Sequence, residues 1–205
     1  HKRSFASKVE AFNQGYTQLK DLDYAFIGNL DADVSFKPDY FERVLEKFHE
    51  NSALGVAGGW IWEPQGGVFI ERNGNRTRHV PGAIQLFRRK CFEDIGGYAP
   101  VYKGGIDTVA ETKAFCSGWM VESFPHMPVM HYRRTSAGKN NILLTRFRQG
   151  EVDYTLSNHL IYQLFKTMYR FNEQPYVLGS LLRLSGYCWA CVNREQRIFS
   201  DAIVS

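Results

Sequence analysis

Short apolar runs alternate with segments of helical periodicity over the first 132 residues, and this alternation limits the chain to a layered α/β architecture. Apolar runs typical of buried strands lie at residues 24–30, 55–62, 82–87, 120–124 and 129–132. Helical patterns lie at residues 4–20, 38–51, 89–95 and 108–117. We therefore expect a sheet flanked by helices, with the Gly-, Asn- and Arg-rich residues 63–79 forming a loop.

The character of the chain changes near residue 133. Residues 133–142 are polar and basic and predict a loop, whereas residues 143–172 and 175–192 predict two apolar helices. We expect residues 1–132 to form one α/β domain and residues 133–205 a loop followed by a helical appendage. The apolar, aromatic surface of those helices either lies on a membrane or packs on the domain or a partner.

Composition narrows the function classes. The 205 residues carry a formal net charge of only +4, which gives no argument for a nucleic-acid partner. No uncharged apolar run reaches the roughly 18 residues that a membrane-spanning helix needs. The hydrophobic content of 44% is enough for a substantial core and is typical of a globular domain.

Two aspartates, Asp31 and Asp33, follow the apolar run at residues 24–30 directly. Ligands of α/β sheets bind at the carboxyl ends of strands, and two close carboxylates there need a neutralising cation. Carboxylate oxygens suit Mg²⁺ or Mn²⁺, either of which bridges a diphosphate well. A second pair, Asp21 and Asp23, precedes the strand in a polar turn, and a solvated turn is the competing interpretation for both pairs.

Several ordered motifs resemble the family 2 glycosyltransferases of the GT-A fold. They are Lys8-x-x-Ala11-Phe12-Asn13-x-Gly15, residues 25–33 ending in Asp31-Ala32-Asp33, Pro81-Gly82-Ala83 with Arg88, Gly96-Gly97-Tyr98, and Gly105-Ile106-Asp107-Thr108 up to Gly118-Trp119. The resemblance covers roughly residues 4–132. It implies a GT-A-like (Rossmann-like) mixed sheet flanked by helices. It also implies truncation at the N-terminus, because the strands that grip the nucleotide base in this family have no counterpart before Lys8.

The resemblance also implies roles for individual residues. Asp33 would coordinate Mg²⁺ or Mn²⁺ on the diphosphate of a nucleotide-sugar donor, with Asp31 contacting the ribose or the metal and His131 as a further metal ligand. Asp107 would be the base that deprotonates the acceptor, with Glu111 one turn later as the backup. The remaining candidates are Lys8, Asn13, Arg146 and Arg148 for the donor and Gly82, Ala83 and Ile106 for the acceptor.

Each of these candidates also has a structural interpretation. Asp107 would serve as a helix N-cap, His131 as a hydrogen-bonded histidine at a strand end, and Arg146 as part of a solvated helix face. The chain departs from the family where Ile106 replaces the usual Glu. It departs again where Leu143 and Phe147 replace the Gln and Trp of the processive synthases, which favours transfer of a single sugar.

We expect an inverting glycosyltransferase that builds a cell-surface or exopolysaccharide glycan on a saccharide or lipid-linked acceptor. It would act at the cytoplasmic face of the plasma membrane, in peripheral contact with the lipid. The alternative is a catalytically inactive binding or scaffold module of the same fold, and a nucleotidyltransferase is a more distant one. Because the base-gripping strands are missing, we expect these 205 residues alone to have little activity and to expose a sheet edge.

Overall fold

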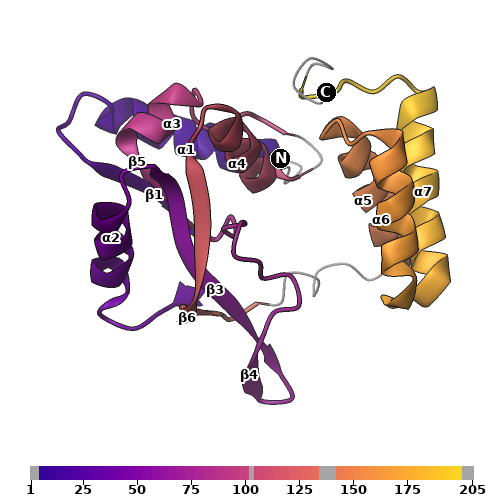
Figure 1. Cartoon of the computed structure of the whole chain (residues 1–205), viewed down its shortest axis with the longest axis horizontal. Helices are drawn as coiled ribbons and strands as arrows, with labels where there is room; N and C mark the ends of the chain where they lie inside the picture. Colours follow the sequence, from indigo (N-terminus) through magenta and orange to yellow (C-terminus); the bar gives the residue numbers. More distant parts are fainter. Residues whose placement is uncertain (1–4, 102–103, 134–141, 200–205) are drawn as a thin grey trace. The chain divides into compact units, whose positions relative to one another are not determined.

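The structure, a computed structural model, describes residues 5–101, 104–133 and 142–199. Two compact units divide the chain: residues 1–101 with 106–135 form the first, and residues 102–105 with 136–205 form the second. The first unit contains the sheet and its flanking helices, and the second is helical (Figure 1).

A mixed sheet forms the centre of the first unit. Its strands run in the order β1-β5-β3-β6-β2, and β4 pairs with the C-terminal end of β3. The strands are β1 (Phe26–Leu30), β2 (Val34–Ser35), β3 (Leu54–Gln65), β4 (Val68–Glu71), β5 (Ile84–Arg88) and β6 (Met120–His131). Strands β3 and β6 are parallel and every other pairing is antiparallel. Strands β1 and β2, which are close in sequence, therefore lie at opposite ends of the strand order.

Helices cover both faces of this sheet (Figure 1). Helix α2 (Tyr40–Glu50) packs Val44 and Phe48 on one face, where they join a core with Ala57 of β3. Helices α1 (Phe5–Leu19), α3 (Arg89–Asp94) and α4 (Ile106–Cys116) cover the other face, and the core beneath them includes Val56 of β3. Neighbouring residues of β3 enter opposite cores because successive side chains of a strand point to opposite faces. The predicted α/β sheet flanked by helices is confirmed.

Three predicted boundaries in the first unit are wrong. Residues 63–79 contain β4, because Gly66 and Gly67, with φ of 62° and 87°, turn the chain back along β3. The two expected strands at 120–124 and 129–132 form the single strand β6, whose pairing with β3 shifts register between Phe124 and Pro128. Helix α4 begins at Ile106, two residues earlier than predicted.

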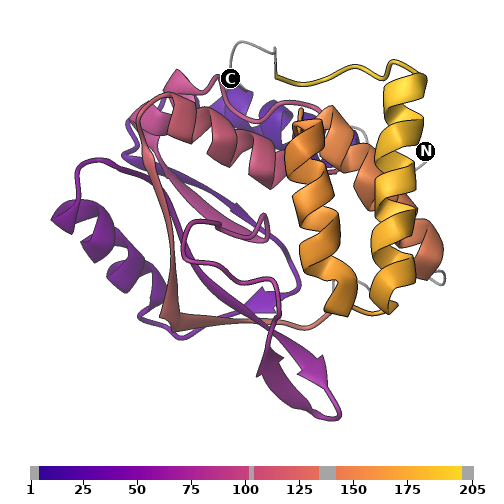
Figure 2. The same cartoon turned by 45° about the vertical axis from the view of Figure 1, so that its right-hand side comes forward.

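The second unit is a small helical assembly (Figure 2). The helix expected over residues 143–172 is interrupted, because Ser157 takes a φ of 62° between α5 (Ile142–Thr155) and α6 (Leu160–Tyr169). A 3₁₀ turn, η1 (Arg170–Asn172), follows, and then α7 (Tyr176–Val192). Among the described residues, none of the helices combines the length and apolar character that crossing a bilayer requires.

Glycines and one buried acid hold these helices together. Gly150 of α5 lies directly against the backbone oxygen of Arg183 in α7, where a Cβ atom would collide. Asp153 is 3% exposed and accepts hydrogen bonds from the Arg183 guanidinium at 2.5 and 2.8 Å and from Lys166 Nζ at 2.9 Å. Burial alone would raise the pKa of Asp153, but these two cations lower it below its usual range.

Candidate active site

The three residues Asp31, Ala32 and Asp33 connect β1 to β2. The amide of Asp31 donates to the carbonyl oxygen of Ala83 at 3.0 Å, just before β5, and the amide of Tyr132 donates to the carbonyl oxygen of Asp33 at 2.9 Å, just after β6. Each aspartate is therefore held to a different strand of the sheet. Asp31 and Asp33 therefore directly follow the apolar strand β1, as the sequence predicted.

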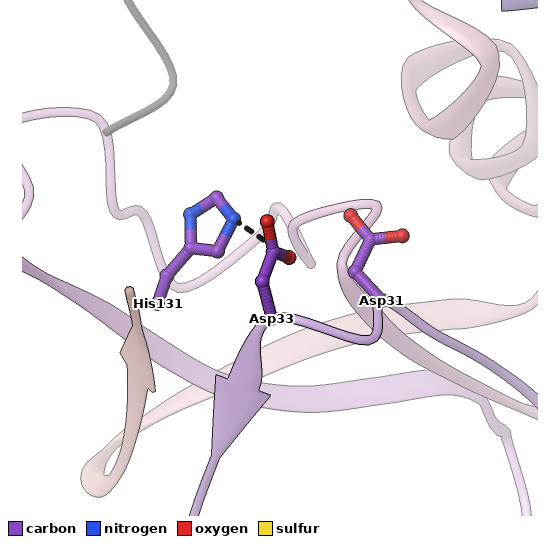
Figure 3. Close-up of side chains that lie close together, drawn as sticks. All are labelled: Asp31, Asp33 and His131. Carbon is purple, nitrogen blue, oxygen red and sulfur yellow. Dashed lines mark ion pairs between the residues drawn. The ribbon is translucent and has the colours of Figure 1, made fainter. Parts of the chain in front are cut away.

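Asp31, Asp33 and His131 lie together and can hold a metal ion (Figure 3). One ligand atom from each lies within 4.8 Å of the other two, and His131 Nε2 is 3.3 Å from Asp33 Oδ1. The opposite ring nitrogen, His131 Nδ1, is buried and has no hydrogen-bond partner among the residues that the structure describes, and Glu63 Oε1 lies 3.8 Å from it. Two carboxylates and an imidazole are a donor set that suits Mn²⁺ or Mg²⁺, so these residues fit the expected ion.

Two basic side chains reach the same carboxylates. Lys8 Nζ of α1 lies 2.5 Å from Asp31 Oδ1 and donates to the carbonyl oxygen of Gly82 at 3.3 Å. Arg133 donates through Nε at 3.0 Å and Nη2 at 2.8 Å to Asp33 Oδ2. Burial alone would raise the pKa of Asp33, but the Arg133 hydrogen bond and the His131 and Arg133 charges lower it. The sequence predicted Lys8 but not Arg133, which is 100 positions from Asp33.

Gly82 connects the acid pair to Asp107. Its carbonyl oxygen accepts from Lys8 and from the Asn29 side chain, while its amide donates to Asp107 Oδ2 at 3.2 Å. Asp107 is the second residue of α4, is half-buried, and receives the Thr108 amide on Oδ1 at 2.9 Å. A Cβ atom on Gly82 would lie only 3.2 Å from the Asp107 carboxylate, so glycine is what allows this close approach.

Glu111 lies deeper in the unit, and it is only 4% exposed. Its Oε1 accepts from the Val80 amide at 2.6 Å and from Gln85 Nε2 at 3.2 Å, and its Oε2 lies 2.8 Å from His79 Nδ1. Burial raises the pKa of Glu111. Burial alone would lower the pKa of His79, but its hydrogen bond to Glu111 outweighs that effect and raises it. These contacts hold His79, Val80 and Gln85 together, and the backup-base role expected of Glu111 stays a prediction.

A buried polar network that the sequence did not reveal continues from Glu111. Gln85 Nε2 also donates to the Val80 carbonyl at 3.1 Å, and Tyr98 Oη donates to Gln85 Oε1 at 2.7 Å. Burial raises the pKa of Tyr98, as do the charges of Asp107, Glu111 and Asp31. The only signal for this network is a glutamine inside the apolar run at 82–87. The network therefore links Tyr98 through Gln85 to Glu111.

The other predicted site residues are more dispersed. Asn13 of α1 donates to the Tyr98 carbonyl at 3.5 Å, and Ile106, the first residue of α4, packs against the core. Arg146 and Arg148 belong to α5 in the second unit, where Arg146 donates to the Gln174 carbonyl at 2.5 Å and pairs with Glu173 at 3.5 Å. Their contact with a donor diphosphate stays a prediction.

Two solved structures similar to this chain are those of glycosyltransferases. The mannosyltransferase PcManGT from Pyrobaculum calidifontis, in complex with GDP-Man and Mn²⁺, is 15% identical with a TM-score of 0.48, covering 90% of this chain and 54% of its own. GalNAc-T7 with UDP, GalNAc and Mn²⁺ is 14% identical with a TM-score of 0.53, covering 87% of this chain and 40% of its own. The chain thus spans about half or less of each. The second likeness confirms the expected GT-A fold.

Sequence comparison is more specific about the family. No curated protein sequence matches the chain. The model of the family described as "Glycosyl transferase family 2" matches residues 2–111, which is more than half of the chain and includes the acid pair, Gly82 and Asp107. The chain belongs to glycosyl transferase family 2.

Proposed function

We propose that this chain carries the metal-holding and proton-accepting part of an active site that transfers one sugar from a nucleotide-sugar donor to an acceptor hydroxyl. The observation that carries the proposal is that Asp31, Asp33 and His131 form a possible metal site and that Gly82 connects it to Asp107. The Gly82 carbonyl oxygen accepts from Lys8, the partner of Asp31, and its amide donates to Asp107. The structure of GalNAc-T7 holds UDP, GalNAc and Mn²⁺, which supports a nucleotide-sugar donor here.

Asp31, Asp33 and His131 would hold Mg²⁺ or Mn²⁺. When bound, the ion would neutralise charge on the diphosphate as that group departs. Lys8 keeps Asp31 in place through its second bond to Gly82, so the acid pair is oriented before any ligand arrives. Glu63, 3.8 Å from His131 Nδ1, favours the ring orientation that points Nε2 at Asp33.

Asp107 would act as the general base. Its carboxylate accepts the acceptor's hydroxyl proton while that oxygen forms a bond to the anomeric carbon, and the bond from that carbon to the diphosphate oxygen breaks with its electron pair. Attack from the face opposite the leaving group inverts the anomeric centre. The Gly82 and Thr108 amides hold the two oxygens of Asp107 by hydrogen bonds, which fixes the base before the acceptor binds.

Two aspartate pairs in one chain allow a matched test. Asp33→Asn should abolish Mn²⁺ binding measured by isothermal titration calorimetry, whereas Asp23→Asn, in the exposed turn before β1, should leave it unchanged. Asp107→Asn should keep Mn²⁺ binding and lose sugar transfer in the full-length protein. Equal loss of Mn²⁺ binding in the Asp33 and Asp23 variants would refute the metal site.

A non-catalytic module is the second candidate, and Ile106 in place of the usual Glu is the observation that favours it. Such a module would bind Mn²⁺ and a nucleoside diphosphate but transfer no sugar. Assaying sugar transfer by the unmodified full-length protein separates the two, because an enzyme transfers sugar and a binding module does not. If Ile106 is the cause of inactivity, Ile106→Glu should create sugar transfer in the module, whose Asp107 is intact.

For the second unit we propose peripheral contact with the cytoplasmic face of the plasma membrane, where a lipid-linked acceptor would be used. Ile161, Phe165 and Met168 on α6 and Leu178 and Trp189 on α7 expose large apolar side chains, which supports this proposal. Phe165→Ser combined with Met168→Ser should abolish co-sedimentation with vesicles rich in anionic lipid. Unchanged co-sedimentation would favour packing of this surface on a protein instead.

A further inference from the structure

Among the described residues, each carboxylate of the acid pair has one Lys or Arg partner, and these two partners differ in how firmly they are held. Lys8 Nζ bonds both to Asp31 and to the Gly82 carbonyl, so losing one contact would leave the other. Arg133 directs Nε and Nη2 at one atom, Asp33 Oδ2, and its side chain is 73% exposed. An exposed arginine held by a single carboxylate oxygen can leave it at little cost.

The position of Arg133 conflicts with a metal at the same carboxylate. Asp33 Oδ1 faces His131 Nε2 at 3.3 Å, and the guanidinium occupies the other oxygen, Oδ2. A divalent ion bound by Asp33 would then lie within a few ångströms of a second positive charge. That repulsion is substantial even in water, so the ion and the guanidinium compete for one carboxylate.

We propose that Arg133 is a displaceable counter-ion. In the metal-free protein Arg133 neutralises Asp33, and it leaves Asp33 when the ion binds. Its Nε and Nη2 then donate hydrogen bonds to the donor diphosphate instead. This inference rests on the proposed metal site and adds the order of events there. Guanidinium groups bind phosphate oxygens through paired hydrogen bonds, so the same nitrogens that hold Asp33 serve the diphosphate. Lys8 stays in place and keeps Asp31 oriented.

The test is a pair of affinities that change in opposite directions. Arg133→Gln should bind Mn²⁺ alone about three- to tenfold more tightly than the unmodified chain, because a competing cation is gone. At saturating Mn²⁺, the same variant should bind GDP or UDP, titrated separately, about tenfold more weakly, because a charged contact to phosphate is lost. Arg133→Lys keeps the charge but loses the paired N–H donors of the guanidinium. Its affinities for Mn²⁺ and for the nucleotide should therefore lie between those of Arg133→Gln and those of the unmodified chain.

Lys90→Gln is the matched control. The Lys90 side chain has the same exposure of 73% as that of Arg133, and it pairs with Asp94 on α3. The substitution Lys90→Gln therefore removes an equivalent charge from a different ion pair. Its Mn²⁺ affinity should change by less than about twofold. Equal Mn²⁺ affinity of Arg133→Gln and the unmodified chain would overturn the inference while leaving the proposed function intact. Absence of Mn²⁺ binding in every variant and in the unmodified chain would overturn both.

Discussion

Replacing Glu111 tests whether its carboxylate supports the site or performs its chemistry. In Glu111→Ala the Val80 amide, now 2.6 Å from Oε1, loses this acceptor in a fully buried position. Gln85 keeps its second bond, to the Val80 carbonyl, and His79 is exposed enough at 26% of its side chain to reach water. One buried donor is therefore stranded by the change, and the side chain leaves a small cavity.

The expected cost follows from those two effects. An unsatisfied buried amide costs about 1–3 kcal/mol, and the lost methylene contacts add about 1 kcal/mol. Glu111→Ala should therefore lower the free energy of unfolding by about 2–4 kcal/mol. Glu111→Gln keeps an oxygen for the Val80 amide and loses only the assistance of the charge, so we expect about 0.5–1.5 kcal/mol.

Urea unfolding followed by tryptophan fluorescence measures both values. A Trp189→Phe background leaves three tryptophans, all of them in the first unit, so the signal reports that unit alone. Glu46→Ala, on the exposed surface of α2, is the control and should change the free energy of unfolding by less than about 0.5 kcal/mol. A Glu111→Gln variant with unchanged stability and no sugar transfer would refute the supporting role and restore Glu111 as a base.

Three further predictions concern stability. Gly150→Ala should destabilise the helical unit by about 1–3 kcal/mol, because the added Cβ atom would collide with the Arg183 backbone. Helix propensity alone would stabilise the variant, so a stabilised variant would contradict the close packing of α5 on α7. Asp153→Ala should cost about 3–5 kcal/mol by leaving Arg183 buried without its acid, which thermal unfolding by circular dichroism measures; a change under 1 kcal/mol would count against that pair. The raised pKa of His79 contributes stability that is complete below its ordinary value of 6.5 and is lost as pH rises through the raised value, and the raised pKa of Glu111 acts in the same direction. Urea unfolding should therefore give a free energy that falls with rising pH above 6.5, and an equal fall in His79→Gln would contradict this assignment.

Local periodicity was sufficient to predict the framework that positions the acid pair. The apolar run at 24–30 contains β1, and the stripe of Val44 and Phe48 gives α2. Such segments are set by burial on one or both faces, and burial leaves a repeat in the sequence. The placement of Asp31 and Asp33 followed, because they come directly after the strand.

Features that depend on contacts between distant residues left no such repeat. Nothing in the sequence places Arg133 on Asp33 or His79 on Glu111, since each pair meets only after the sheet has formed. The turn at Gly66 and Gly67 did carry a local signal, but the loop composition around it obscured β4. Ser157 ends a helix with a positive φ that serine rarely adopts, so the break before α6 was not foreseeable from composition.

The strand order gives a bound ion a mechanical consequence. Strands β1 and β2 lie at opposite ends of the order, and the short segment between them is bonded to Ala83 at one aspartate and to Tyr132 at the other. An ion bound by both carboxylates would connect two parts of the sheet. It would link the residue before β5, through Asp31, to the residue after β6, through Asp33. Mn²⁺ should then slow amide hydrogen exchange in β1 and β2 together, although neither strand touches the other.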